Sequence, residues 1–246
     1  MNTNPFAFGP CPVCGSDYLT YLRDVRAVRL GRDVPLRVCL HCRSFTCAAG
    51  YVEGDQELRD DAQYHTKFID QKTQQYRWLL DMLRRGDSLA DVGCGIGTLC
   101  NAAKGMWPTV VGYDINPHAI ECGKKLFPGL DLRYGPFGYD GAVFDTVTVV
   151  DTLEHIAEPI PFIQTVVSHL SPGGFLYITV PLLDEDKYHW LAESKEKDGS
   201  PFADCAVHVT HFSRPGLVML CEHAGLRRES TTPQGWPRDG ELFFKP

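Results

Sequence analysis

The stretch ADVGCGIGTLC, residues 90–100, constrains the fold of this chain more than any other feature. Asp91 stands two residues before the first of three alternating glycines, Gly93, Gly95 and Gly97, which follow a short apolar run. A glycine-rich turn after a strand lets the backbone approach a ligand closely. In open α/β folds this turn lies at the carboxyl ends of the strands, where ligands bind. The sequence therefore predicts a nucleotide-like ligand on a sheet.

Apolar strands and amphipathic helices alternate after this turn. Alternation of this kind indicates a parallel sheet with helices on both faces, the α/β class. A helical pattern that includes Tyr64 and ends at Gly86 precedes the sheet, and Pro172-Gly173-Gly174 is expected to close a later helix. We expect strands at 86–92, 109–114, 130–134, 144–151 and 175–181, helices at 97–106, 117–127 and 161–170, and a final helix with two closing strands.

Two CxxC pairs stand near the N-terminus, CPVC at 11–14 and CLHC at 39–42, with 24 residues between them. The intervening residues alternate in polarity and include Gly31 and Pro35, which is typical of a hairpin. Such pairs hold tetrahedral zinc in a zinc ribbon, a closed structural site that supplies folding energy. The expected ligands are Cys11, Cys14, Cys39 and Cys42.

Alternatives to this zinc site remain open from the sequence. The four residues could be ordinary buried cysteines, and His41 could replace one thiolate, although the paired spacing favours Cys42. Cys47 lies outside the pattern, and we expect it to be a small buried residue.

The glycine segment and those that follow resemble the class I S-adenosylmethionine-dependent methyltransferases. DVGCGIGTL (91–99) is similar to their first motif, and its spacing differs from the G-x-G-x-x-G of nicotinamide and flavin enzymes. The fourth-strand segment resembles the branch that includes the ubiquinone-biosynthesis methyltransferases. The segments that carry the resemblance in order are VVGYDIN (110–116), FDTVTVVDTLEHIAEP (144–159), LSPGGFLYITVP (170–181) and HVTHFSRPGLVMLCEHAGL (208–226).

This resemblance implies a Rossmann-like methyltransferase sheet that binds S-adenosylmethionine. Its glycines would approach the methionine part, and Asp91 would receive the ammonium group. Asp114 would accept both ribose hydroxyls, unless it caps the helix that begins at Pro117. The cofactor residues so implied are Asp91, Gly93, Gly95, Gly97, Asp114, Ile115, Phe137 and Asp151.

The adenine site departs from the family pattern. Many relatives carry an aspartate after the third strand, where Pro136 and Phe137 stand here, and Asp140 comes late. We expect backbone groups and stacking on Phe137 to hold adenine, with Ile115 packed on the ring.

Methyl transfer to an alcohol or phenol needs a base as well as alignment. The candidates that follow the fourth strand are Asp151, Thr152, Glu154 and His155, and those before the last helix are His208 and His211. Strand alternation would turn only one of His208 and His211 to the substrate, and His211 is preferred. For His155 a structural role is favoured over a catalytic one, and a packing role for His211 is equally open. Tyr188, His189 and Trp190 could line the acceptor site.

The expected organisation is a zinc ribbon at 1–50, a helical linker or lid at 51–85, and a methyltransferase domain at 86–246 with an insertion at 182–210. Residues 1–50 hold six arginines and three aspartates, which give a net charge of +3. Because the whole chain has a net charge of −7, the remaining residues carry a net charge of −10. An acidic main domain makes a nucleic-acid substrate a weaker expectation.

The function expected is methyl transfer from S-adenosylmethionine to a small molecule, a sugar, sugar nucleotide or secondary metabolite, with oxygen favoured as the acceptor atom. One alternative is an RNA methyltransferase whose ribbon holds RNA, and another is a non-catalytic zinc-ribbon binding protein. No run reaches the roughly 18 apolar residues of a membrane span, and the N-terminus does not read as a signal peptide. We expect a cytoplasmic protein without a membrane partner, and a homodimer is a further expectation.

Overall fold

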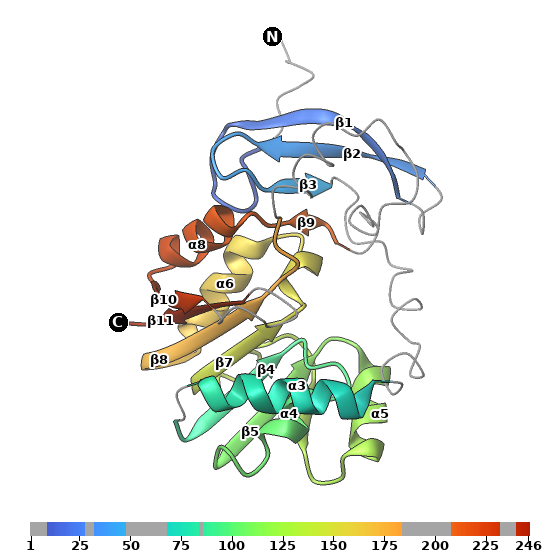
Figure 1. Cartoon of the computed structure of the whole chain (residues 1–246), viewed down its shortest axis with the longest axis vertical. Helices are drawn as coiled ribbons and strands as arrows, with labels where there is room; N and C mark the ends of the chain where they lie inside the picture. Colours follow the sequence, from blue (N-terminus) through green and yellow to red (C-terminus); the bar gives the residue numbers. More distant parts are fainter. Residues whose placement is uncertain (1–8, 28–31, 48–67, 84–85, 184–207, 232–239) are drawn as a thin grey trace.

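A computed structural model describes residues 9–27, 32–47, 68–83, 86–183, 208–231 and 240–246 (Figure 1). These residues form a large α/β unit, with a smaller sheet at the end where the N-terminus lies. Among the described residues, no helix is long and apolar enough to cross a membrane.

The large unit is built on a seven-stranded sheet of order β10-β11-β8-β7-β4-β5-β6. The strands from β6 to β8 pair in parallel, while β11 runs antiparallel to both of its neighbours. Because the chain order reverses beside β4, the carboxyl ends of β4 and β7 meet where such folds bind ligands. The strands are β4 Ser88–Val92, β5 Thr109–Asp114, β6 Asp131–Tyr134, β7 Phe144–Val150, β8 Leu170–Thr179, β10 Arg227–Thr231 and β11 Gly240–Phe244.

Helices cover both faces of this sheet, which confirms the predicted fold class. Consecutive residues of β4 show the two faces: Leu89 packs with the helices α3 and α4, whereas Ala90 belongs to the cluster that contains α6 and α8. The helices are α3 Ile69–Met82, α4 Thr98–Ala103, α5 Pro117–Leu126, α6 Pro159–Ser168 and α8 Arg214–His223.

One turn lies elsewhere than expected. Pro172-Gly173-Gly174 does not close a helix but lies inside β8, which begins at Leu170. The amide of Gly173 donates to the carbonyl of Lys245, and that of Lys245 donates to Gly174, both at 2.9 Å. These bonds to the C-terminal segment keep the turn within the sheet.

The smaller sheet has the order β1-β2-β3-β9, with β1 Leu19–Ala27, β2 Arg32–Cys39, β3 Phe45–Cys47 and β9 Thr210–His211. The antiparallel pair β1 and β2 is the hairpin predicted between the two CxxC pairs. The strands β3 and β9 were not predicted. Through β9, a segment from the C-terminal part of the chain completes the sheet that the N-terminal residues begin (Figure 1).

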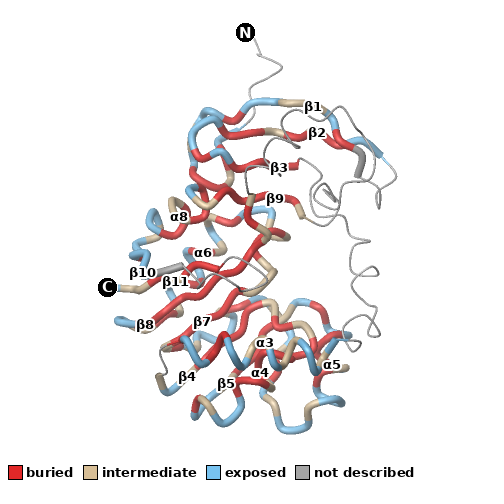
Figure 2. Tube along the Cα trace, viewed as in Figure 1, coloured by how far each residue is buried: buried red, intermediate tan, exposed pale blue. Residues whose placement is uncertain are grey.

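The two sheets share a hydrophobic core. Val13 and Cys42 of the N-terminal part belong to the same buried cluster as Phe212 and Leu217 beside α8, and Figure 2 shows the buried trace continuing between the two parts. The expected boundary near residue 50 and most of the expected insertion at 182–210 lie outside the described residues.

Candidate functional site

The glycine turn joins β4 to α4, and two of its glycines have different reasons to be there. A Cβ on Gly93 would lie 2.2 Å from Thr152 Oγ1, so the turn packs tightly on the segment after β7. A Cβ on Gly95, whose φ is +55°, would meet no described atom within 4 Å. Gly95 is therefore the point where the backbone is open to a close ligand.

Asp114 ends β5 and ties this turn in place. Its Oδ2 accepts a hydrogen bond from the amide of Gly95 at 2.7 Å, and its Oδ1 accepts from the amide of Asn116 at 2.8 Å. Asn116, not Asp114, caps α5, because its side chain accepts from the amides of His118 and Ala119. Each carboxylate oxygen of Asp114 keeps a lone pair for a further donor, such as a ribose hydroxyl.

Asp91 is buried in β4. Its Oδ1 accepts a hydrogen bond from Thr148 Oγ1 at 2.7 Å. Burial raises the pKa of Asp91 to about 7, and the negative charge of Asp114 acts in the same direction. A positively charged ligand group would stabilise the carboxylate and bring this pKa down.

The expected adenine residues differ in exposure. Ile115 is 45% exposed and can pack on a ligand ring, whereas Phe137 is 9% exposed. The Phe137 ring makes an edge contact with Tyr113, at 5.2 Å between centroids, and lies near Phe144 at 6.2 Å. Most of the Phe137 surface is thus already used in the core, which leaves little of its ring for stacking on adenine.

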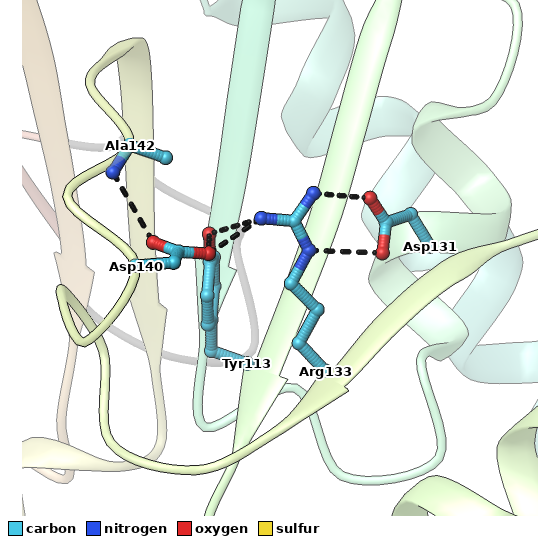
Figure 3. Close-up of polar contacts among 5 residues, drawn as sticks. All are labelled: Tyr113, Asp131, Arg133, Asp140 and Ala142. Carbon is cyan, nitrogen blue, oxygen red and sulfur yellow. Dashed lines mark hydrogen bonds and ion pairs between the residues drawn. The ribbon is translucent and has the colours of Figure 1, made fainter.

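Asp140 is also committed to protein contacts (Figure 3). It accepts hydrogen bonds from Tyr113 at 2.9 Å, Arg133 at 2.5 Å and the amide of Ala142 at 3.2 Å. Arg133 bridges from Asp140 to Asp131 on the other side of its guanidinium group. The sequence departure noted after β6 is therefore not compensated by a carboxylate from Asp140.

Asp151 follows β7 in a left-handed conformation, with φ of 51°, which costs a non-glycine residue energy. Its amide donates to the carbonyl of Thr179 at 3.1 Å, and Thr179 Oγ1 donates to its carboxylate at 3.3 Å. Bonds to β8 thus hold a strained acidic residue at the carboxyl edge of the sheet.

Three histidines gather just beyond Asp151. His155 ends the 3-10 turn η2, Leu153–His155, and its ring lies edge-on to that of His208, at 4.9 Å between centroids. The His208 and His211 rings are 6.3 Å apart. β9 begins at Thr210, so the strand alternation from which only one of these two was expected to face the site does not extend to His208.

His211 is the histidine that sequence reasoning preferred as the base, and its burial argues against that role. It is 6% exposed, and burial lowers its pKa to about 3, with His208 adding to the shift. A histidine with so low a pKa is neutral and a weak proton acceptor near pH 7. His155 and His208 are only half-buried.

The same place holds Glu154, a buried acidic residue that was among the candidates after the fourth strand. The ligand atoms of Glu154, His155 and His208 all lie within 4.8 Å of one another, which is a set that can hold a divalent cation. The burial of Glu154 has no local signal in the sequence.

The four expected metal-ligating cysteines are brought together. Cys11 Sγ lies 3.8 Å from Cys42 Sγ, Cys14 Sγ lies 3.7 Å from Cys39 Sγ, and all four sulfurs lie within 4.8 Å of one another. Four sulfurs around tetrahedral zinc, with bonds of about 2.3 Å, are about 3.8 Å apart, so the cluster fits this metal. The exposed His41 remains outside the cluster, with its Nδ1 3.9 Å from Cys14 Sγ.

The thiols of this cluster differ in pKa. Burial raises the pKa of Cys14 to about 11, and the hydrogen bond with Cys42, together with burial, raises that of Cys11, whereas the same hydrogen bond lowers the pKa of Cys42 to about 5. A bound dication stabilises the thiolates and removes this penalty. Cys47 is buried as expected but is disulfide-bonded. Tyr188, His189 and Trp190 lie outside the described residues.

Comparison with known proteins agrees with this geometry. A family model described as a methyltransferase domain matches residues 62–231, more than half of the chain. The ubiquinone biosynthesis O-methyltransferase of Paracidovorax citrulli is 30% identical over 109 residues, which are 39% of this chain and 44% of that protein. The Vibrio cholerae protein of the same name is 25% identical over 156 residues, 60% of this chain and 64% of that protein.

The chain thus matches less than two thirds of the length of these two relatives. Among solved structures, mitomycin 7-O-methyltransferase MmcR superposes with a TM-score of 0.60 at 14% identity, covering 77% of this chain and 60% of that one. At this identity the likeness concerns the fold alone.

Proposed function

We propose that this chain, which belongs to the methyltransferase-domain family and is an S-adenosylmethionine-dependent methyltransferase, transfers the methyl group to an oxygen atom of a small-molecule acceptor. The observation that carries the proposal is the histidine group, His155, His208 and His211, which lies beside the glycine turn between β4 and α4. Thr152 packs on Gly93, and His155, three residues later, lies against His208. Base-type side chains thus stand next to the turn where the methyl donor would bind.

The cofactor would lie across the carboxyl ends of β4 and β5. In this proposal the backbone at Gly95 approaches the methionine part, Asp91 balances its ammonium charge, and Asp114 accepts from the ribose hydroxyls. Ile115, exposed at the end of β5, packs on the adenine ring. With Asp140 committed to Arg133 and Tyr113, backbone groups would recognise the adenine edge.

When bound, S-adenosylmethionine supplies an electrophilic methyl group, and the protein supplies alignment and proton removal. We assign the base to the His155–His208 pair, and to His211 the supporting place in the sheet. The strained Asp151 would orient the acceptor hydroxyl, because its carboxylate stands at the end of β7. The two ubiquinone biosynthesis relatives are named as O-methyltransferases, which supports oxygen as the acceptor atom.

The test is methyl transfer from tritium-labelled S-adenosylmethionine to a panel of phenols, catechols, sugars and sugar nucleotides, with total RNA in a parallel reaction. We expect a labelled small molecule. His155→Gln or His208→Gln should then lower kcat by about 100-fold, the ordinary contribution of a general base. His223→Gln, an exposed histidine at the end of α8, is the matched control and should behave as the wild type. Labelled RNA with a silent small-molecule panel would contradict the proposal.

Of the ribbon arginines whose burial is described, Arg32 and Arg43 are exposed, but the other two give the RNA alternative little support. Arg23 and Arg37, on the hairpin, are half-buried, and burial lowers the pKa of both guanidinium groups. Side chains that grip phosphates need to be exposed and gathered on one face.

A further inference from the structure

The ribbon and the histidine group share one strand pair. In it, Phe45 of β3 pairs with His211 of β9, and Thr46 pairs with Thr210. The amide of Cys47 donates to the carbonyl of Val209 at 2.9 Å, which extends the pairing toward His208. The strand that carries His211 is therefore the last strand of the ribbon sheet (Figure 1).

A buried pair of serines fastens the metal-binding turn to the same segment. The Ser213 hydroxyl donates to the carbonyl of Cys42, and it accepts from the amide of Gly216 at 3.0 Å as the N-cap of α8. The amide of Ser213 donates to Ser44 Oγ at 3.2 Å. One residue thus joins the backbone of a cysteine of the cluster, the start of α8 and the end of β9.

The contact between the start of α8 and the ribbon is tightly packed. A Cβ on Gly216 would lie 2.2 Å from Ser44 Oγ and 3.3 Å from Val13 Cγ1, so the first turn of α8 packs directly on these two ribbon side chains. The amide of Cys39 donates to the carbonyl of Ser44 at 3.0 Å, which closes the turn that carries the second CxxC pair. A movement of the Cys39–Ser44 turn therefore has to move Ser213 and β9 with it.

We propose that Ser44 and Ser213 are positioning residues that couple metal occupancy of the four-cysteine cluster to the histidine group. A loaded cluster fixes the Cys39–Ser44 turn, the turn fixes Ser213, and Ser213 fixes β9. The strand, together with the hydrogen bond from Cys47 to Val209 that precedes it, then holds His208 against His155. The ribbon thereby positions the histidines of the acceptor site. This inference rests on the function proposed for those histidines.

The test uses the full chain loaded with zinc and the variants Ser213→Ala, Ser213→Thr and Ser44→Ala. Ser16→Ala is the matched control, because Ser16 lies just after the first CxxC pair. Among the contacts described, its hydroxyl accepts only from the nearby amide of Tyr18. Three quantities are measured: bound zinc, affinity for S-adenosylhomocysteine, and amide hydrogen exchange in residues 208–213 compared with β7.

We expect Ser213→Ala to keep its zinc and to bind S-adenosylhomocysteine within about twofold of the wild type. Exchange in residues 208–213 should rise at least tenfold while β7 stays protected, and Ser213→Thr, which keeps the hydroxyl, should restore protection. Removing zinc from the wild type with a chelator should produce the same local exchange. Unchanged exchange in residues 208–213 after both the serine substitution and zinc removal would overturn the coupling.

A variant that loses protection in β7 as well has lost the fold, and Ser44→Ala and the chelated wild type then decide the result. The histidine assignment is tested separately. If the coupling is observed but His155→Gln and His208→Gln transfer methyl groups normally, the proposed base is wrong and the coupling stands. If those variants are inactive but exchange in residues 208–213 never changes, only the coupling fails.

Discussion

At the scale of single residues, the buried position of Asp91 favours its protonated, neutral form when no ligand is bound. Burial raises its pKa to about 7, so the unliganded protein holds a proton there through mildly acidic pH. A ligand ammonium group favours the ionised form. We therefore predict that affinity for S-adenosylhomocysteine rises between pH 6 and pH 8, and that binding at pH 6 releases a proton.

Calorimetry in two buffers of different ionisation enthalpy measures that proton. Asp91→Asn should bind more weakly and lose the pH dependence. A wild type without proton release, or an Asp91→Asn variant with the same pH profile, would show that Asp91 does not face the ammonium group.

His211 makes a prediction for stability. Its folded pKa is about 3, below the ordinary value of about 6.5, so the unfolded chain binds more protons at this site between those two pH values. Stability from this residue is thus lost as pH falls below about 6.5. We predict that the free energy of unfolding drops by about 1.4 kcal/mol more in the wild type than in His211→Gln between pH 7.5 and pH 5.5.

Urea titrations at the two pH values measure this difference. Asp91 has the opposite sign, because its folded pKa is raised, and its contribution is lost as pH rises toward 7. Comparing wild type with the His211 variant cancels the Asp91 contribution. Equal pH dependence in both proteins would mean that His211 is not buried in the neutral form.

At the scale of elements, the turn between β4 and α4 separates packing from ligand binding. Gly95→Ala should destabilise by about 1 kcal/mol, the cost of its positive φ, and should weaken S-adenosylhomocysteine binding at least tenfold because the new Cβ enters the ligand space. Gly93→Ala adds the clash with Thr152 and should cost about 1–3 kcal/mol more. Thermal unfolding and calorimetry measure both effects. A Gly95→Ala variant with normal affinity would place the ligand elsewhere.

The elements that the sequence predicted are those long enough to show a hydrophobic pattern. The strands β4 to β7 fall within one residue of their expected positions at each end, except that β4 begins two residues later than expected, because apolar residues in short runs between helices mark buried parallel strands. The hairpin β1–β2 was equally visible between the CxxC pairs. Strands as short as β3 and β9 show no period, and each forms only because the other half of the chain supplies its partner.

The site divides in the same way. The sequence indicated the cysteine cluster and the acidic residue at the end of β5, since local spacing encodes both. It did not indicate that Asp140 would be held by Arg133, that Phe137 would lie in the core, or that Asn116 would cap α5. Those outcomes depend on side chains that meet only after the sheet has formed.

At the scale of the whole molecule, the ribbon and the α/β unit share one buried core, and we expect them to unfold together. The cysteines and Val13 lie in the same buried cluster as Phe212 and Leu217. Structural zinc sites supply much of the folding free energy of small domains. We predict that zinc chelation lowers the unfolding temperature of the whole chain and that unfolding remains one transition. Two separate transitions, with only the first sensitive to chelator, would show that the ribbon is independent.

The most direct test of the account is a calorimetric titration of wild type, Asp114→Ala and Asp131→Ala with S-adenosylhomocysteine. Asp131 is the matched control, because it is a carboxylate at the start of β6 that pairs with Arg133. We predict that Asp114→Ala weakens binding by about 10- to 100-fold, the loss of hydrogen bonds to a charged group, while Asp131→Ala binds as the wild type. Equal affinity in wild type and a folded Asp114→Ala protein would contradict the cofactor site on which the account depends.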